Sequence, residues 1–166
     1  MSLTAKLNLT LAATLTSALD LSTPDDTLSY SHKVNLTSGT GNNQGDMLWH
    51  DQRTLAASGT EDLDLAGALS NAFGATQTFV ELVAVGIFAA SGNTNDVQLT
   101  RPASNGAPLF LAAGDGIAVK PGGAFYWVAP NTGITVTAGT GDLLTVTNSA
   151  GSTGVTYDVV IIGRSA

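Results

Sequence analysis

The feature that constrains this chain most is the alternation of apolar and polar residues with a period of two. Near the start, Leu7, Leu9 and Leu11 are separated by single polar residues. Near the end, the run 155–162 alternates in the same way and then becomes apolar on both faces. Successive side chains of a β-strand point to opposite faces of the sheet, so this period predicts strands with one buried face. The best helical candidate, 65–73, is interrupted by glycine.

Turn residues divide the rest of the chain into short apolar runs. These runs, which we expect to be strands, lie at 79–90, 117–119, 125–128, 134–136 and 143–146. Segments rich in Gly, Pro, Asn, Ser and Thr follow them, at 120–123, 129–133, 138–142 and 148–154. Such residues favour turns because glycine reaches positive φ and proline fixes φ. Strands spaced about 8–12 residues apart predict an all-β fold, an antiparallel, jelly-roll-like β-sandwich with at most one or two short helical turns.

Composition supports the same fold class and a single domain. Only 11% of the 166 residues are charged, and Glu occurs twice and Lys three times. Because these two residues cover the wet faces of soluble helices, a helical bundle or an ordinary α/β enzyme is disfavoured. The length suits one hydrophobic core. We therefore expect one β-sandwich domain over 1–166, in which residues 1–35 form an edge strand or a docking arm.

The charge and the missing cysteines exclude several classes of function. Six Lys and Arg stand against thirteen Asp and Glu, a net charge of −7. So few cations cannot neutralise a run of phosphates, and no nucleic-acid partner is expected. Without Cys, neither a disulfide framework nor a thiolate metal site is possible. The longest apolar run, 79–90, contains Glu81 and is shorter than the about 20 residues of a membrane helix, so no membrane partner is expected.

Motifs for cofactors and for catalysis are incomplete. The run 157–163 is similar to the strand before a dinucleotide-binding loop, but of the glycine fingerprint only Gly163 is present. His32 and His50 are the two histidines of the chain, too few for a histidine-rich metal site. We therefore expect no cofactor, no metal and no catalytic residue.

Two segments with oxygen ligands leave alternatives open. Asp62 and Asp64 would share one face of a strand, near the lower end of the about 5–10 Å separation of glycosidase carboxyls. The turn 92–96 carries amide and carboxylate oxygens of the kind that Ca²⁺ prefers. Solvated turns explain both segments more simply, because Asp and Asn favour turns for conformational reasons. A β-sandwich glycosidase and a Ca²⁺-dependent module are the minor alternatives.

Four residues are candidates for contact with a partner: Trp49, His50, Tyr126 and Trp127. Tyr126 and Trp127 adjoin in one expected strand, so one ring points inward and the other outward. An outward aromatic side chain is typical of a protein or sugar contact. His50 and Asp51 point to opposite faces for the same reason, so they are not expected to form a catalytic pair.

Five phrases of the sequence resemble small β-sandwich structural proteins of tailed bacteriophages. They are Asp46-Met-Leu-Trp-His-Asp-Gln-Arg-Thr54, Asp62-Leu-Asp-Leu-Ala-Gly67, Lys120-Pro-Gly-Gly123, Val136-Thr-Ala-Gly-Thr-Gly-Asp142 and Tyr157-Asp-Val-Val-Ile-Ile-Gly163. The likeness runs over most of residues 35–165. It implies a protein that decorates or cements a capsid, or occupies a head–tail or tail position, often as a trimer. It implies no catalytic residues.

The residues and the resemblance together predict a non-enzymatic virion protein, most concretely a capsid decoration or cement protein. The alternative is a tail, head-fibre or head–tail connector module that binds a receptor or a glycan. The expected partners are the major capsid protein or another virion protein, and further copies of this chain, with a trimer favoured. The expected location is the virion, after assembly in the host bacterial cytoplasm.

Overall fold

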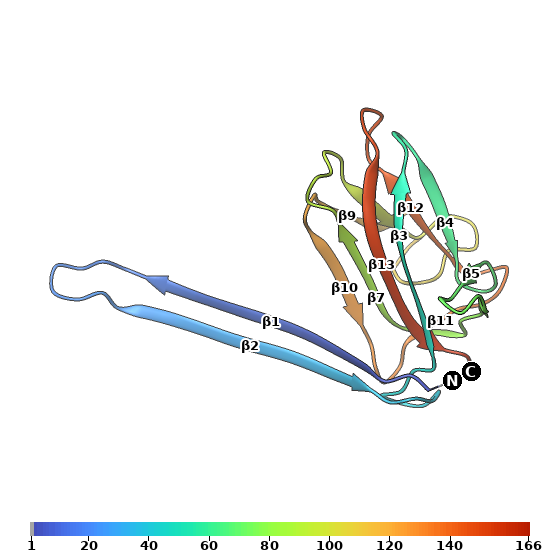
Figure 1. Cartoon of the computed structure of the whole chain (residues 1–166), viewed down its shortest axis with the longest axis horizontal. Coiled ribbons are helices and arrows are strands. Elements are labelled where there is room, and N and C mark those ends of the chain that lie inside the picture. The colour runs from blue at the N-terminus through green and yellow to red at the C-terminus, as the bar shows by residue number, and fades with distance from the viewer. Residues whose placement is uncertain (1) are drawn as a thin grey trace.

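The computed structural model describes residues 2–166 and has two parts, a long hairpin and a β-sandwich body (Figure 1). The hairpin consists of β1 (Ala5–Thr16) and β2 (Asp25–Leu36) and projects from one end of the body. We call residues 5–36 the arm. No helix occurs among the described residues, and the segment 65–73 forms turns and one short strand. The predicted all-β sandwich is therefore confirmed.

The body is built from two antiparallel sheets. Sheet I has the strand order β10-β7-β13-β3, and the short β11 also pairs with β7. Its strands are β3 (Met47–Leu55), β7 (Glu81–Ala89), β10 (Ala124–Val128), β11 (Ile134–Thr135) and β13 (Val155–Arg164). Sheet II has the order β4-β12-β8-β9. Its strands are β4 (Thr60–Asp64), β8 (Val97–Thr100), β9 (Gly116–Val119) and β12 (Leu143–Asn148). A separate short hairpin joins β5 (Leu69–Ser70) to β6 (Thr76–Gln77).

The apolar runs of the sequence coincide with strands of the body. The run 79–90 contains β7, which lies inside sheet I between β10 and β13. The four shorter runs coincide with β9, β10, β11 and β12. Because turn residues fall between these runs, the local chemistry of the chain accounts for where each strand ends.

The main core lies between the two sheets and depends on alternate residues of β13. Tyr157, Val159 and Ile161 point inward and have no solvent exposure. Leu99 of β8 and Leu144 of β12 belong to the same cluster and are equally buried. Burial of these side chains removes apolar surface from water, which is the dominant favourable contribution to folding.

A second, smaller core lies on the outer side of sheet I. Val34 and Leu36, at the end of β2, are buried there with Val83, Ala84 and Ile162. Ile162 lies next to the inward-facing Ile161, so it points to the opposite face of the sheet. The end of β13 is thus apolar on both faces, as its sequence predicted. This second core fixes the base of the arm to the body.

A buried arginine connects the loops at the base of the arm. Arg164 is only 2% exposed, and its guanidinium forms an ion pair with Glu81. It also donates hydrogen bonds to the backbone carbonyls of Gln44 and Pro130, at 3.1 and 2.6 Å. The second carboxylate oxygen of Glu81 accepts a hydrogen bond from the backbone N–H of Gly133. Because Gln44 lies in the loop between β2 and β3, this network holds the attachment of the arm in place.

Replacing Arg164 should cost far more stability than breaking a surface ion pair. Arg164→Met leaves Glu81 without its cation and the carbonyls of Gln44, Pro130 and Asn131 without their donor. We expect a loss of about 3–5 kcal/mol in the free energy of unfolding. The matched control is Lys120→Met, which breaks the exposed pair with Asp96 and should cost at most about 1 kcal/mol. Urea unfolding of both variants and the parent measures the difference. Equal losses would contradict this role of Arg164.

Candidate interaction surface

The arm is amphipathic because residues directly opposite each other in its two strands share a face. One face carries the pairs Leu7–Val34, Leu9–His32, Leu11–Tyr30, Ala13–Leu28 and Leu15–Asp26. The other face carries mainly Asn, Ser, Thr and Lys side chains, as in the pairs Asn8–Lys33, Thr10–Ser31 and Thr14–Thr27. We call the first the apolar face of the arm.

The apolar face of the arm is covered only at its base. Leu7 and Val34 pack in the second core, whereas the residues farther out are exposed. Seven of the twelve exposed large hydrophobic side chains in the described chain lie on the arm: Leu9, Leu11, Leu15, Leu19, Leu21, Leu28 and Tyr30. At about 3.3 Å per residue, the strands of the arm are roughly 40 Å long. An isolated two-stranded hairpin is marginally stable in water, and an apolar patch of this extent marks an interaction site.

The outer face of sheet I carries a second exposed apolar surface. His50, Val160, Gly86 and Tyr126 form one row across its four strands, from β3 to β10. Phe88, on β7, is 40% exposed beside this row. A Cβ atom at position 86 would lie only 2.9 Å from the Phe88 ring. The ring therefore lies over Gly86, where any larger residue would displace it. The row is therefore apolar in its centre, with a polar histidine at its β3 end.

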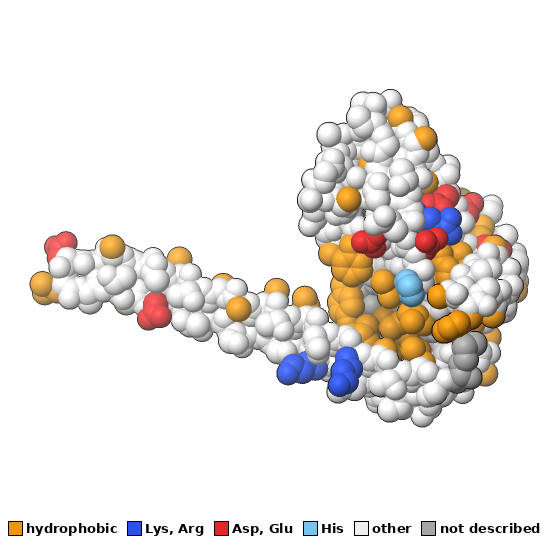
Figure 2. All heavy atoms as spheres, in the orientation of Figure 1, with side chains coloured by type: hydrophobic (Ala, Val, Ile, Leu, Met, Phe, Trp, Pro, Cys, Tyr) orange, Lys and Arg blue, Asp and Glu red, His pale blue; other side chains and the backbone are white. Residues whose placement is uncertain are grey.

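A hollow of about 230 Å³ lies where the base of the arm meets this row. The arm contributes Lys6 and Leu7, and sheet I contributes Ala84, Gly86, Phe88, Tyr126, Val160 and Ile162. Figure 2 shows hydrophobic side chains along one edge of the arm and over the part of the body beside the arm base. The two apolar surfaces therefore meet at a corner, and the hollow is the uncovered part of that corner.

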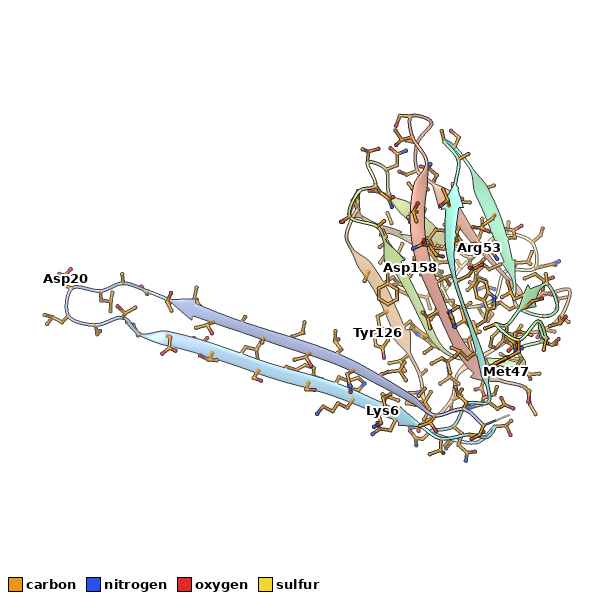
Figure 3. All side chains as sticks on the ribbon, viewed as in Figure 1. Lys6, Asp20, Met47, Arg53, Tyr126 and Asp158 are labelled. Carbon is orange, nitrogen blue, oxygen red and sulfur yellow. The ribbon has the colours of Figure 1, made fainter. Side chains whose placement is uncertain are left out.

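Tyr126 gives the hollow an unused polar group. Its hydroxyl is buried and has no hydrogen-bond partner among the described residues. Burial raises the pKa of Tyr126 above its usual value, so this hydroxyl stays protonated and can donate a hydrogen bond. In Figure 3, Tyr126 lies on β10, the strand of sheet I that borders the gap between body and arm.

The charges of the arm are separated along its length. Lys6 and Lys33 lie near its base, and Asp20, Asp25 and Asp26 lie in or beside the loop at its tip. Figure 3 shows Lys6 and Asp20 at opposite ends of the arm. None of these five side chains forms an ion pair within residues 2–166. The arm is therefore an electric dipole, negative at the tip and positive at the base.

The four predicted contact residues are divided between the core and the surface. Trp49 is 2% exposed, and Trp127 packs against the main core from β10, so both side chains contribute to packing. His50 and Tyr126 lie in one row on the outer face of sheet I. The alternation of Tyr126 and Trp127 is as predicted, and it selects Tyr126 as the outward aromatic residue.

A polar cluster links the two sheets on the inner side of β3. Arg53 pairs with Asp51 at 2.9 Å and with Glu61 of β4 at 3.4 Å, and its guanidinium lies 5.5 Å from the centre of the Trp49 ring. The hydroxyl of Tyr157 donates a hydrogen bond to Glu61 at 2.7 Å. Asp51 therefore pairs with Arg53, two residues along the same strand, and not with His50.

The acidic and amide side chains of the two alternative sites form hydrogen bonds within the protein, mostly to a neighbouring strand or loop. Asp62 accepts a hydrogen bond from the Thr145 hydroxyl, and Asp64 accepts one from the backbone N–H of Ala66. In the turn 92–96, the amide of Asn95 bonds to Asn148 and to backbone carbonyls of the loop 149–154. No group of three His, Asp or Glu side chains close enough to hold a metal ion occurs in residues 2–166.

The arm side chains that now carry the interaction surface were not among the predicted contacts. Leu28, Tyr30 and Val34 alternate with polar residues, a signal that was present in the sequence of 25–36. The outward position of Phe88 could not be predicted, because the run 79–90 is almost continuously apolar and shows no period of two. The sequence shows which residues share a face of a strand, whereas only the folded structure shows which of these faces is left exposed to solvent.

Comparisons with family models and with curated proteins give no match to this chain. Within residues 2–166, no helix has the length and apolar character needed to cross a membrane. Function is therefore inferred from the geometry of the arm and of sheet I.

The buried Tyr157 phenol makes stability fall at alkaline pH. Burial and, next, the bond to Glu61 raise the pKa of the Tyr157 phenol well above its usual value of 10.0. Between these two pKa values the unfolded chain has lost the phenolic proton that the folded chain keeps, so the stabilisation is complete below pH 10 and is lost as pH rises. We expect an additional loss of up to about 1.4 kcal/mol per pH unit above pH 10.

Urea unfolding of the parent and of Tyr157→Phe between pH 8 and pH 11.5, a range chosen to span the onset near pH 10, measures this loss. The variant should be less stable at pH 8 by about 1 kcal/mol and should lose less stability as pH rises. Tyr30→Phe, on the exposed arm, is the control and should follow the parent. Parallel curves for the parent and Tyr157→Phe would exclude this contribution.

Proposed function

We propose that this chain is a non-enzymatic structural protein of a tailed-phage virion. Its most concrete role is that of a decoration or cement protein, which binds the lattice of the major capsid protein and stabilises it. The observation that carries the proposal is the arm, a roughly 40 Å ribbon with an uncovered apolar face. Because such a ribbon gains stability only when another surface covers it, the chain is suited to a role within an assembly.

The surface of the body agrees with this role. Away from the hollow, the outer faces of the sheets carry short polar side chains, as in the pair Thr54–Thr156 on sheet I and the pair Thr60–Thr147 on sheet II. Short side chains lose little conformational entropy when a partner covers them. A surface of this kind is favourable for a protein that must bind in many copies against a larger coat.

The proposal includes the state and location of the chain. We propose a homo-oligomer, with a trimer favoured, whose partner is the major capsid protein or another virion protein. We propose assembly in the bacterial host cytoplasm, followed by residence on the virion. We also propose a jelly-roll connection of the strands, since the body has two four-stranded sheets apart from β11 and the separate hairpin of β5 and β6.

Imaging of purified particles tests the proposal. We expect density of the size and shape of this chain at defined lattice positions of the capsid, and capsids without the chain should open at lower temperature. A variant in which a short turn replaces residues 9–32 keeps Leu7, Val34 and Leu36 of the second core, so it should leave the body folded and abolish or weaken occupancy of these positions. Density only on the tail, a fibre or the connector would contradict the cement role and favour the alternative module. Absence from particles would contradict both.

A further inference from the structure

The arm base already shows that the apolar face of the arm fits the outer face of sheet I. Leu7 and Val34 of the arm pack there against Ala84 and Ile162. The next row of the same sheet, with Gly86 at its centre, is the floor of the hollow. The arm leaves the body at this point (Figure 1), and of its apolar residues only Leu7 lines the hollow. The hollow therefore fits a second segment of the same character.

We propose that the arm tip of one copy of this chain docks in the hollow of a second copy, so that copies are joined by exchange of their arms. The apolar side chains nearest the tip are Leu15, Leu19, Leu21 and Leu28, which are 54–100% exposed. Phe88 and Val160 offer them an apolar floor. The inference does not depend on the proposed virion role, because the contact forms between purified copies.

Charge favours a second copy as the occupant. The tip carries Asp20, Asp25 and Asp26, and the rim of the hollow carries Lys6, with Lys33 nearby on the arm. Docking tip to base brings these unpaired charges of opposite sign within the about 10 Å over which they attract in dilute salt. Two arms placed base to base would instead bring the lysines together.

The Tyr126 hydroxyl supplies a further match. It is a buried donor without a partner among residues 2–166, and the Tyr126 side chain lines the hollow. A carboxylate of an incoming tip would accept its hydrogen bond, which removes the cost of about 1–3 kcal/mol for a buried polar group left unsatisfied. The apolar, charged and hydrogen-bonding features of the hollow thus all correspond to features of the tip.

Arm exchange uses one tip and one hollow of each copy, so it gives a finite assembly when the rotation between copies closes. Two copies exchange arms reciprocally about a two-fold axis, and three copies exchange them in a ring. The ring of three is the arrangement that the proposed trimer requires. In both cases every hollow and every tip is used between copies, so no further copy can join by the same contact, and the middle of each arm, with Leu9, Leu11 and Tyr30, stays available to another partner.

Sedimentation measures the assembly directly. The purified chain should sediment at a multiple of its 16.8 kDa mass at micromolar concentration. Leu15→Asp, on the apolar face of the arm, should weaken self-association about tenfold or more, because a charge is then buried against apolar groups. Thr14→Asp is the matched control, since it places the same charge one residue away on the polar face, and it should associate like the parent. A parent chain that stays monomeric overturns the proposal.

Cross-linking identifies the contact and does not depend on the stability of the arm. The chain has no Cys, so copies carrying only Leu19→Cys can be mixed with copies carrying only Phe88→Cys. A short thiol cross-linker should join the two kinds of copy in high yield. Thr54→Cys, at the far end of the same face of sheet I, is the control partner and should give little product. Equal yields with Phe88→Cys and Thr54→Cys overturn the proposal.

Discussion

The structure depends on a single strand, β13, whose second half is apolar on both faces. Its inward residues, such as Tyr157 and Ile161, complete the sandwich core, and its outward residue Ile162 completes the second core. An ordinary sandwich strand needs only one apolar face, since the other meets water. Here the second face anchors the arm, and Arg164 at the end of the same strand binds the loop that leads from the arm to the body. The body and the arm are thus one physical unit.

The ionisable side chains of the body are mostly committed to its own structure. Arg53, Lys120 and Arg164 each have a carboxylate partner, and Arg101 donates to two carbonyl groups. The other two cations, Lys6 and Lys33, both lie at the arm base. Because the chain has so few charges, the two unpaired lysines at the arm base mark a place where an acidic partner would gain favourable electrostatic free energy.

The sequence predicted well where the strands lie, but it did not predict which strands pair or which side chains pack together. The alternation at 155–162 predicted both faces of β13, and the same rule separated Tyr126 from Trp127. The hairpin of the arm was missed, although residues 25–36 alternate as clearly as residues 5–16, because a strand pattern does not identify the partner strand. Trp49 illustrates the same limit. Its aromatic character favours contacts of any kind, and only the fold decides that its contacts lie in the core.

The second core has a consequence for the order in which a newly made chain acquires its shape. Residues 5–36 are synthesised before the strands of the body, yet Val34 and Leu36 pack against Ile162 of β13. The hairpin can form early from local contacts, but its direction relative to the body is set only after β13 has joined sheet I. An unfinished or truncated chain therefore carries an arm that points in no fixed direction. Pairing of β13 in sheet I therefore precedes the step that fixes the direction of the arm.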